Sequence, residues 1–216
     1  MDALFLYGTN CTKEIWDALM PQLSSWDCEM LSYPHAITRE ATCLSDLTEW
    51  VFKQTEGKHY DVIIGHSLGG LIALELVVEY SASVGRIICL DTNLKPAGAF
   101  FHDLMTKTHM EQYGQQVNGV MTSERPYYTQ APMRSLQEEF DYTPLLSQIG
   151  IPIYLLMRDR GQSDPMDHIC ELQLPICALD KIQIRFVSDS CHMPMVENPV
   201  QLAEMLCQIC NAETDK

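Results

Sequence analysis

The chain has 216 residues, of which 46% are hydrophobic and 20% are charged. These are ordinary values for a globular protein, and they exclude wholesale disorder, collagen and coiled coil. With 14 basic and 29 acidic residues, the formal net charge is -15. A field of that sign repels phosphate backbones and anionic lipid headgroups, so we expect a small-molecule substrate and neither nucleic acid nor membrane as a partner.

The sequence shows no pattern of a membrane span or of a signal peptide. The longest apolar stretch, residues 68–78, contains Glu75 and is shorter than the roughly 20 residues that a span needs. The first four residues lack the basic region of a signal peptide. We therefore expect a cytoplasmic protein, whose nine cysteines are reduced and mostly buried.

Short, largely apolar runs alternate with helical patterns along most of the chain. Such runs, bounded by Gly, Pro or polar residues, predict strands at residues 3–7, 29–33, 61–65, 86–91, 151–157 and 181–187. Apolar residues at helical spacing predict helices over residues 12–23, 42–55 and 68–80. This alternation is typical of an α/β fold, in which helices cover both faces of a parallel sheet.

Residues 96–141 interrupt the alternation. Aromatic and methionine side chains are scattered through polar helical sequence, and no strand-like run occurs. A long structureless loop would be unusual inside a compact domain, so we expect a helical cap here, inserted into a core of residues 1–95 and 142–216. From this cap, Phe100, Phe101, Met105 and Tyr127 are expected to bind substrate.

Ser67 lies in the string Gly65-His66-Ser67-Leu68-Gly69, between a predicted strand and a predicted helix. This is the context that the G-x-S-x-G nucleophile elbow requires. Both glycines are needed because a strained serine brings its neighbours close together, and a Cβ at either position would clash. We predict that Ser67 is a nucleophile, with the N-terminus of the following helix favouring developing negative charge.

A serine nucleophile needs a base, and the chain has seven histidines. His192 follows the last predicted strand, so it should lie at the same carboxyl edge of the sheet as Ser67. His66 is adjacent to Ser67, and its side chain is expected to point elsewhere. The remaining histidines fall in connections or in the insertion, where a solvated side chain is expected: His35, His59, His102, His109 and His168.

Several segments resemble the α/β-hydrolase superfamily. Residues 65–70 match its nucleophile elbow, and residues 191–199, with His192, Pro194 and Glu197, are similar to its G-H-x-P-x-x-E-x-P stretch. The resemblance covers nearly the whole chain. It is strongest to the small-cap serine hydrolases, which include carboxylesterases, the pimeloyl carrier-protein methyl ester esterase, enol-lactonases and carbon–carbon bond hydrolases.

The resemblance implies a fold and an oxyanion hole. The family's two N-terminal antiparallel strands are missing, because the first strand already ends in the segment Leu6-Tyr7-Gly8-Thr9, which resembles its L-H-G-x turn. We therefore expect a six-stranded, all-parallel sheet with the strands in the order 2-1-3-4-5-6. The backbone N–H groups of Thr9 and Leu68 are the expected oxyanion donors. Tyr7 and Cys191 depart from the family's usual histidine and glycine.

The acid of a Ser-His-Asp triad has three candidates, each near the end of a predicted strand. In this superfamily the acid usually follows the strand after the cap, which favours Asp159 and Asp164 over Asp91. Asp164 precedes Pro165, as the family's acid often does, and it lies 28 residues before His192. The resemblance therefore favours Asp164, although Asp159 and Asp91 stay open. Asp159 could instead form an ion pair with Arg158 or Arg160.

These residues predict a serine hydrolase that cleaves small, apolar, uncharged esters or thioesters through an acyl-enzyme. No dinucleotide, P-loop or zinc-protease motif occurs, and the C-x-x-C string at residues 207–210 has no second pair, so no cofactor or metal is expected. Two alternatives stay open. One is carbon–carbon cleavage or lyase chemistry on the same fold, and the other is a non-catalytic binding protein, which the departures at Tyr7 and Cys191 suggest.

Overall fold

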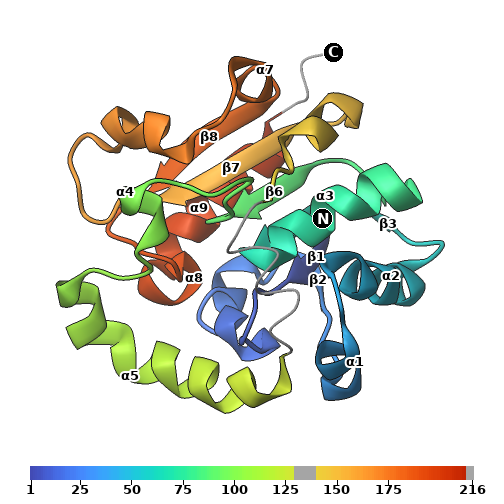
Figure 1. Ribbon diagram of the computed structural model, residues 1–216, viewed down its shortest axis with the longest axis horizontal. Helices are drawn as coiled ribbons and strands as arrows, with labels where there is room; N and C mark the ends of the chain where they lie inside the picture. Colours follow the sequence, from blue (N-terminus) through green and yellow to red (C-terminus); the bar gives the residue numbers. More distant parts are fainter. Residues whose placement is uncertain (129–139, 213–216) are drawn as a thin grey trace.

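A six-stranded sheet forms the centre of the computed structural model, which describes residues 1–128 and 140–212. All neighbouring strands in it are parallel, in the spatial order β2-β1-β4-β6-β7-β8 (Figure 1). The strands are β1 (Asp2–Leu6), β2 (Asp27–Met30), β4 (Val62–His66), β6 (Ile87–Leu90), β7 (Ile153–Arg158) and β8 (Ile182–Val187). The predicted α/β class, strand number and strand order are confirmed.

The four inner strands, β1, β4, β6 and β7, are buried along nearly their whole length. This burial explains why they appear in the sequence as continuous apolar runs, since a parallel sheet has no solvent-facing side. A second, two-stranded sheet pairs β3 (His59–Tyr60) with β5 (Ser83–Val84). Strands this short carry no periodicity, and the sequence pattern did not predict them.

Helices flank the central sheet. The longer ones are α2 (Leu44–Thr55), α3 (Leu68–Tyr80) and α9 (Pro199–Asn211), and the short ones are α1 (His35–Glu40), α7 (Ile176–Leu179) and α8 (Pro194–Glu197). Where one helix was predicted over residues 12–23, two 3-10 turns occur instead, η1 (Lys13–Trp16) and η2 (Met20–Leu23). Pro21 accounts for the break, because proline lacks an N–H and its ring clashes with the preceding turn of an α-helix.

The described part of the segment predicted to be a cap contains three helical elements. It contains α4 (Ala99–His102), the 18-residue α5 (Lys107–Glu124) and the turn η3 (Arg125–Tyr127). Figure 1 shows α5 lying apart from the sheet, below α8 and the N-terminal turns. The rest of the predicted cap, residues 129–139, lies outside the described residues. The chain then returns through η4 (Thr143–Gln148) to β7, and η5 (Pro165–Leu172) follows β7.

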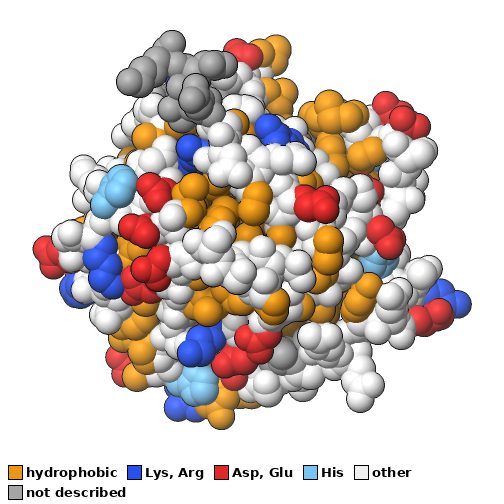
Figure 2. Space-filling view, turned by 180° about the vertical axis from the view of Figure 1, so that it is seen from behind, with side chains coloured by type: hydrophobic (Ala, Val, Ile, Leu, Met, Phe, Trp, Pro, Cys, Tyr) orange, Lys and Arg blue, Asp and Glu red, His pale blue; other side chains and the backbone are white. Residues whose placement is uncertain are grey.

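The surface charge is dispersed on one face, and the cysteines differ in part from expectation. On the face shown in Figure 2, acidic side chains are spread among apolar ones instead of forming one patch. Four cysteines are buried, two are partly buried, and Cys43, Cys170 and Cys177 are exposed, so fewer thiols are buried than predicted. Within residues 1–128 and 140–212, no helix is long and apolar enough to span a membrane.

Candidate active site

The turn at Ser67 has the steric constraints that its glycines imply. Ser67 immediately precedes α3 and has φ 51° and ψ -118°, a strained conformation for a residue with a Cβ. A Cβ on Gly65 would lie 2.3 Å from the carbonyl oxygen of Gly69, and one on Gly69 would lie 2.3 Å from that of Leu6. Only glycine fits at either position, as predicted.

Neighbouring strands hold this turn in place. The hydroxyl of Thr92, just after β6, donates a hydrogen bond to the carbonyl of Ser67 at 2.9 Å. At the end of β1, a Cβ on Gly8 would lie 2.9 Å from the Cβ of Ser67. The β1 turn therefore abuts Ser67, and Thr9 and Leu68 line the same cavity of about 520 Å³ as Ser67. This is where the two predicted oxyanion donors were expected.

His192 lies in that cavity as well. Its ring Nδ1 is 2.5 Å from Oδ2 of Asp91, the residue that directly follows β6. Two backbone contacts fix the position of His192. Its N–H donates to the carbonyl of Leu104 at 3.0 Å, and its carbonyl accepts from Nε2 of His66 at 2.8 Å. Ser67, His192 and Asp91 thus meet at one edge of the sheet.

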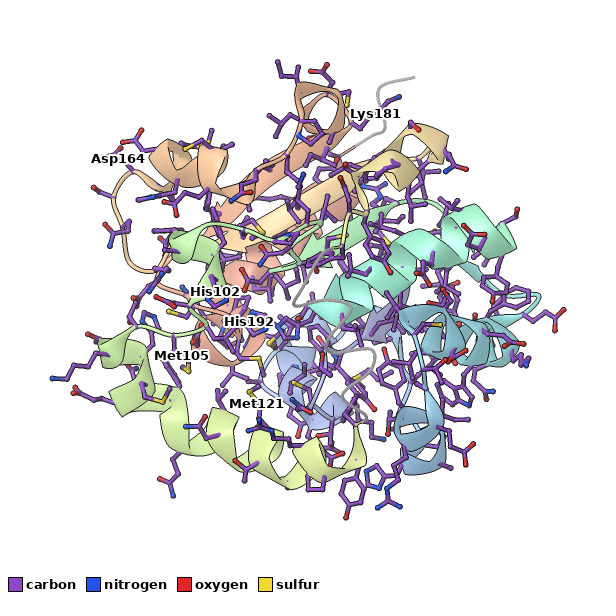
Figure 3. All side chains as sticks on the ribbon, viewed as in Figure 1. His102, Met105, Met121, Asp164, Lys181 and His192 are labelled. Carbon is purple, nitrogen blue, oxygen red and sulfur yellow. The ribbon has the colours of Figure 1, made fainter. Side chains whose placement is uncertain are left out.

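The acid expected from the family spacing, Asp164, is not near His192. Asp164 is exposed and accepts a hydrogen bond from the Ser163 hydroxyl at 3.1 Å. Figure 3 shows it at the start of η5, well away from His192. The long loop after β7 carries it outward, so the placement predicted for Asp164 is wrong. Asp159 is not the partner either, since its Oδ1 accepts from the backbone N–H groups of Gly161 and Ser190.

A buried arginine shares the carboxylate of Asp91. Arg158, the last residue of β7, is only 1% exposed, and its Nη1 donates to Oδ2 of Asp91. The same Nη1 lies 3.3 Å from Nδ1 of His192. Burial by itself raises the pKa of Asp91, but the Arg158 guanidinium and the hydrogen bond with His192 outweigh it and hold that pKa at about 2. Asp91 is therefore ionised at neutral pH.

His66 is a positioning residue that the sequence analysis missed. Its side chain is 1% exposed, and burial is the main cause that lowers its pKa to about 3. The neutral ring donates from Nε2 to the His192 carbonyl, while its Nδ1 has no hydrogen-bond partner among the described residues. The sequence did contain a sign of this role. His66 is the last residue of a buried strand and directly precedes Ser67, so its side chain lies close to the turns around Ser67.

Glu197 supports the loop that carries His192. Its Oε2 accepts from the backbone N–H of Cys191, and its backbone carbonyl accepts from the Tyr113 hydroxyl at 3.0 Å. Burial raises the pKa of Glu197 to about 7. Cys191, at the family's glycine position, is buried, and its sulfur accepts from the N–H of Thr106 at 3.4 Å. The departure at position 191 thus links the loop to the segment before α5.

The four predicted substrate-binding residues are divided in the structure. Phe101 lines the cavity of Ser67, and Met105 lines an adjoining cavity that also contacts His192. Phe100 lies outside both cavities because its ring stacks on His168, with ring centres 3.9 Å apart. Tyr127 does too, since it stacks on His35 at 3.7 Å. Among the described residues, no cluster of three or more His, Cys, Asp or Glu side chains could hold a metal ion.

Comparison with models of protein families gave no match, and comparison with curated protein sequences gave none either. Solved structures are similar over nearly the whole chain. MenH from S. aureus is 12% identical, with a TM-score of 0.74 and coverage of 98% of this chain and 95% of that one. A bromoperoxidase from Bacillus anthracis is 12% identical, with a TM-score of 0.72 and coverage of 98% and 92%.

A thermophilic esterase from Thermogutta terrifontis is 15% identical, with a TM-score of 0.71 and coverage of 97% of this chain and 89% of that one. At such identities the likeness concerns the fold. It agrees with the six-stranded parallel sheet and the helices that flank it. The protein has the α/β-hydrolase fold.

Proposed function

We propose that the protein is a serine hydrolase that cleaves small, uncharged carboxylic esters or thioesters through an acyl-enzyme. One observation carries the proposal. His192 is joined by Nδ1 to a buried, ionised aspartate and shares a cavity with a serine on a strained strand-to-helix turn. A nucleophile, a base and a group that orients the base are the three parts that this chemistry requires.

In this mechanism the Ser67 hydroxyl attacks the substrate carbonyl and His192 takes its proton. Asp91 keeps the proton of the ring on Nδ1, so that Nε2 is free to act as the base. The backbone N–H groups of Thr9 and Leu68 stabilise the negative oxygen of the tetrahedral intermediate. His192 then returns the proton to the leaving group, and water, activated in the same way, releases the acid.

Arg158 changes the electrostatic balance of this triad. Its charge offsets that of Asp91, so the cavity wall carries a buried ion pair instead of a lone carboxylate. A buried charge without a partner would be costly. The ion pair therefore keeps Asp91 ionised and fixed in orientation. It also means that Arg158 and His192 compete for the negative charge of Asp91.

The cavity lining supports small, apolar substrates. Around Ser67 it includes Leu71, Phe101, Leu104 and Met121, and a lining of this kind with a few polar groups suits uncharged ligands. The strongly negative net charge also disfavours polyanionic substrates such as coenzyme A esters.

Active-site labelling tests the proposal. A fluorophosphonate probe should label the wild-type protein stoichiometrically at Ser67 and leave Ser67→Ala unlabelled, and short p-nitrophenyl esters should be hydrolysed. Absence of labelling in the folded protein contradicts the nucleophile and favours a binding protein. Labelling without ester turnover favours the carbon–carbon cleaving alternative.

A further inference from the structure

Two cavities meet at His192. The first, called here the Ser67 cavity, has been described above. The second has a volume of about 590 Å³ and lies between α5, the segment 103–105 and Met193. The two cavities share Asn10, Leu104, Met121 and His192.

Methionines dominate the second cavity, called here the methionine cavity. Its apolar lining consists of Leu104, Met105, Met110, Val117, Met121 and Met193. Val117 and Met193 are buried, and the polar lining residues Asp103, Asn118, Thr122 and Arg125 are exposed and form a rim. Methionine side chains are flexible and adapt to the shape of an apolar group, so this lining suits an aliphatic chain. Figure 3 shows Met105 and Met121 between His192 and α5.

The two cavities contact different parts of the proposed catalytic machinery. Ser67, Thr9 and Leu68 line only the Ser67 cavity, whereas His192 lines both. The acyl carbon must lie against Ser67, with its oxygen toward the backbone of Thr9 and Leu68. The atom that leaves must instead lie within reach of His192, which protonates it.

From this we infer that the methionine cavity binds the leaving group, and that the leaving group is an alcohol with an aliphatic chain of several carbons. This inference rests on the proposed serine hydrolase function. It adds that the larger group of the ester is on the alcohol and not on the acyl group. The ester C–O bond breaks, its oxygen takes the proton that His192 received from Ser67, and the alcohol departs. The acyl group stays on Ser67 until water releases it.

Two isomeric esters separate the two sides of the substrate. Hexyl acetate and ethyl hexanoate contain the same atoms, but the long chain is on the alcohol in the first and on the acyl group in the second. We expect the wild-type protein to show the higher kcat/KM with hexyl acetate. Val117→Phe should fill the methionine cavity, because Val117 lines it and is absent from the Ser67 cavity. Ala97→Phe is the matched control, because Ala97 lines only the Ser67 cavity.

The ratio of kcat/KM for hexyl acetate to that for ethyl hexanoate is the readout. In Val117→Phe it should fall by about tenfold or more, the scale on which apolar pockets discriminate by a methylene or two, and in Ala97→Phe it should rise. If Val117→Phe does not fold, Met110→Trp replaces it, since Met110 is 43% exposed and tolerates a larger side chain. A ratio that rises or stays constant in the folded methionine-cavity variant overturns the inference.

Failure of the proposed function gives a different result. A wild-type protein that hydrolyses neither ester and is not labelled at Ser67 contradicts both the function and this inference. A protein that is labelled and hydrolyses both esters, but whose ratio does not respond to Val117→Phe, contradicts the inference alone.

Discussion

The turn around Ser67 and the contact between Asp91 and His192 line the same cavity. The turn is formed by residues that are consecutive in the chain, whereas the contact joins residues that are far apart in it. The conformation of Ser67 is set by one strand, one helix and two glycines within five consecutive residues. The partner of His192 is Asp91, 101 residues earlier in the chain and on another strand. Local sterics therefore fix the conformation of Ser67, whereas packing between strand ends selects the partner of His192.

Replacing the nucleophile should have the largest effect. Ser67→Ala keeps the Cβ and the turn, so we expect normal folding and a fall in kcat on the order of 10⁴ to 10⁶, as for loss of a triad member elsewhere. Ester hydrolysis and a thermal melt measure the two properties. Turnover near that of the wild type would show that the serine turn is structural only.

On the acid side, Asp91→Asn should lower kcat on the order of 10⁴, because the amide no longer fixes the ring tautomer of His192. Asp164→Asn is the control and should keep nearly full activity, since Asp164 is exposed and contacts Ser163. Kinetics of both folded variants decide the assignment. Loss of activity in Asp164→Asn with activity retained in Asp91→Asn would restore the acid that the family spacing favours.

The sequence predicted the sheet and the serine turn because their determinants are short-range. Apolar runs marked the six strands of the main sheet, and the strand order expected from the family resemblance is the order observed. The carboxylate beside His192 was mispredicted because the spacing rule assumes a short loop after β7. Here the segment from Asp159 to Asp164 turns away from His192, and its length alone does not show the direction that it takes.

A signal for the contact between Asp91 and His192 was present in the sequence. Arg158 ends an apolar strand, and a buried arginine needs a carboxylate. Asp91 directly follows the neighbouring strand β6, so strand order places the two side by side. From the sequence, Arg158 was expected to pair only with Asp159, its neighbour in the chain. The role of His66 was missed for a related reason, since its contact with His192 spans 126 residues.

The next largest effect should come from breaking the ion pair between Arg158 and Asp91, and it should appear in the free energy of unfolding. Arg158→Met leaves Asp91 buried without its counter-charge, which costs roughly 3 to 5 kcal/mol in the free energy of unfolding. The double variant Asp91→Asn with Arg158→Met removes both charges and should be more stable than the sum of the single changes predicts. Urea unfolding of all four proteins measures the coupling. Strict additivity would mean that the pair contributes nothing beyond its separate members.

The smallest expected effect concerns Glu197, which supports the His192 loop from behind. Burial raises the pKa of this carboxyl from 4.5 to about 7 in the folded protein. The folded state therefore holds this proton more tightly than the unfolded chain does. The resulting stabilisation is fully present below pH 4.5 and is lost as the pH rises through 7.

Glu197→Gln tests this pH dependence, because the amide keeps an acceptor for the Cys191 N–H but never carries the charge. At pH 8 the variant should exceed the wild type in free energy of unfolding by roughly 3 to 3.5 kcal/mol, because the pKa rises from 4.5 to about 7 and each pKa unit corresponds to about 1.4 kcal/mol. Near pH 4.5 the two should be alike. Glu204→Gln, at an exposed position on α9, is the matched control for loss of one carboxylate. If the difference in free energy of unfolding between Glu197→Gln and the wild type stays constant from pH 4.5 to 8, the carboxyl of Glu197 does not change its protonation in this range. Its role in the loop would then be the hydrogen bond alone.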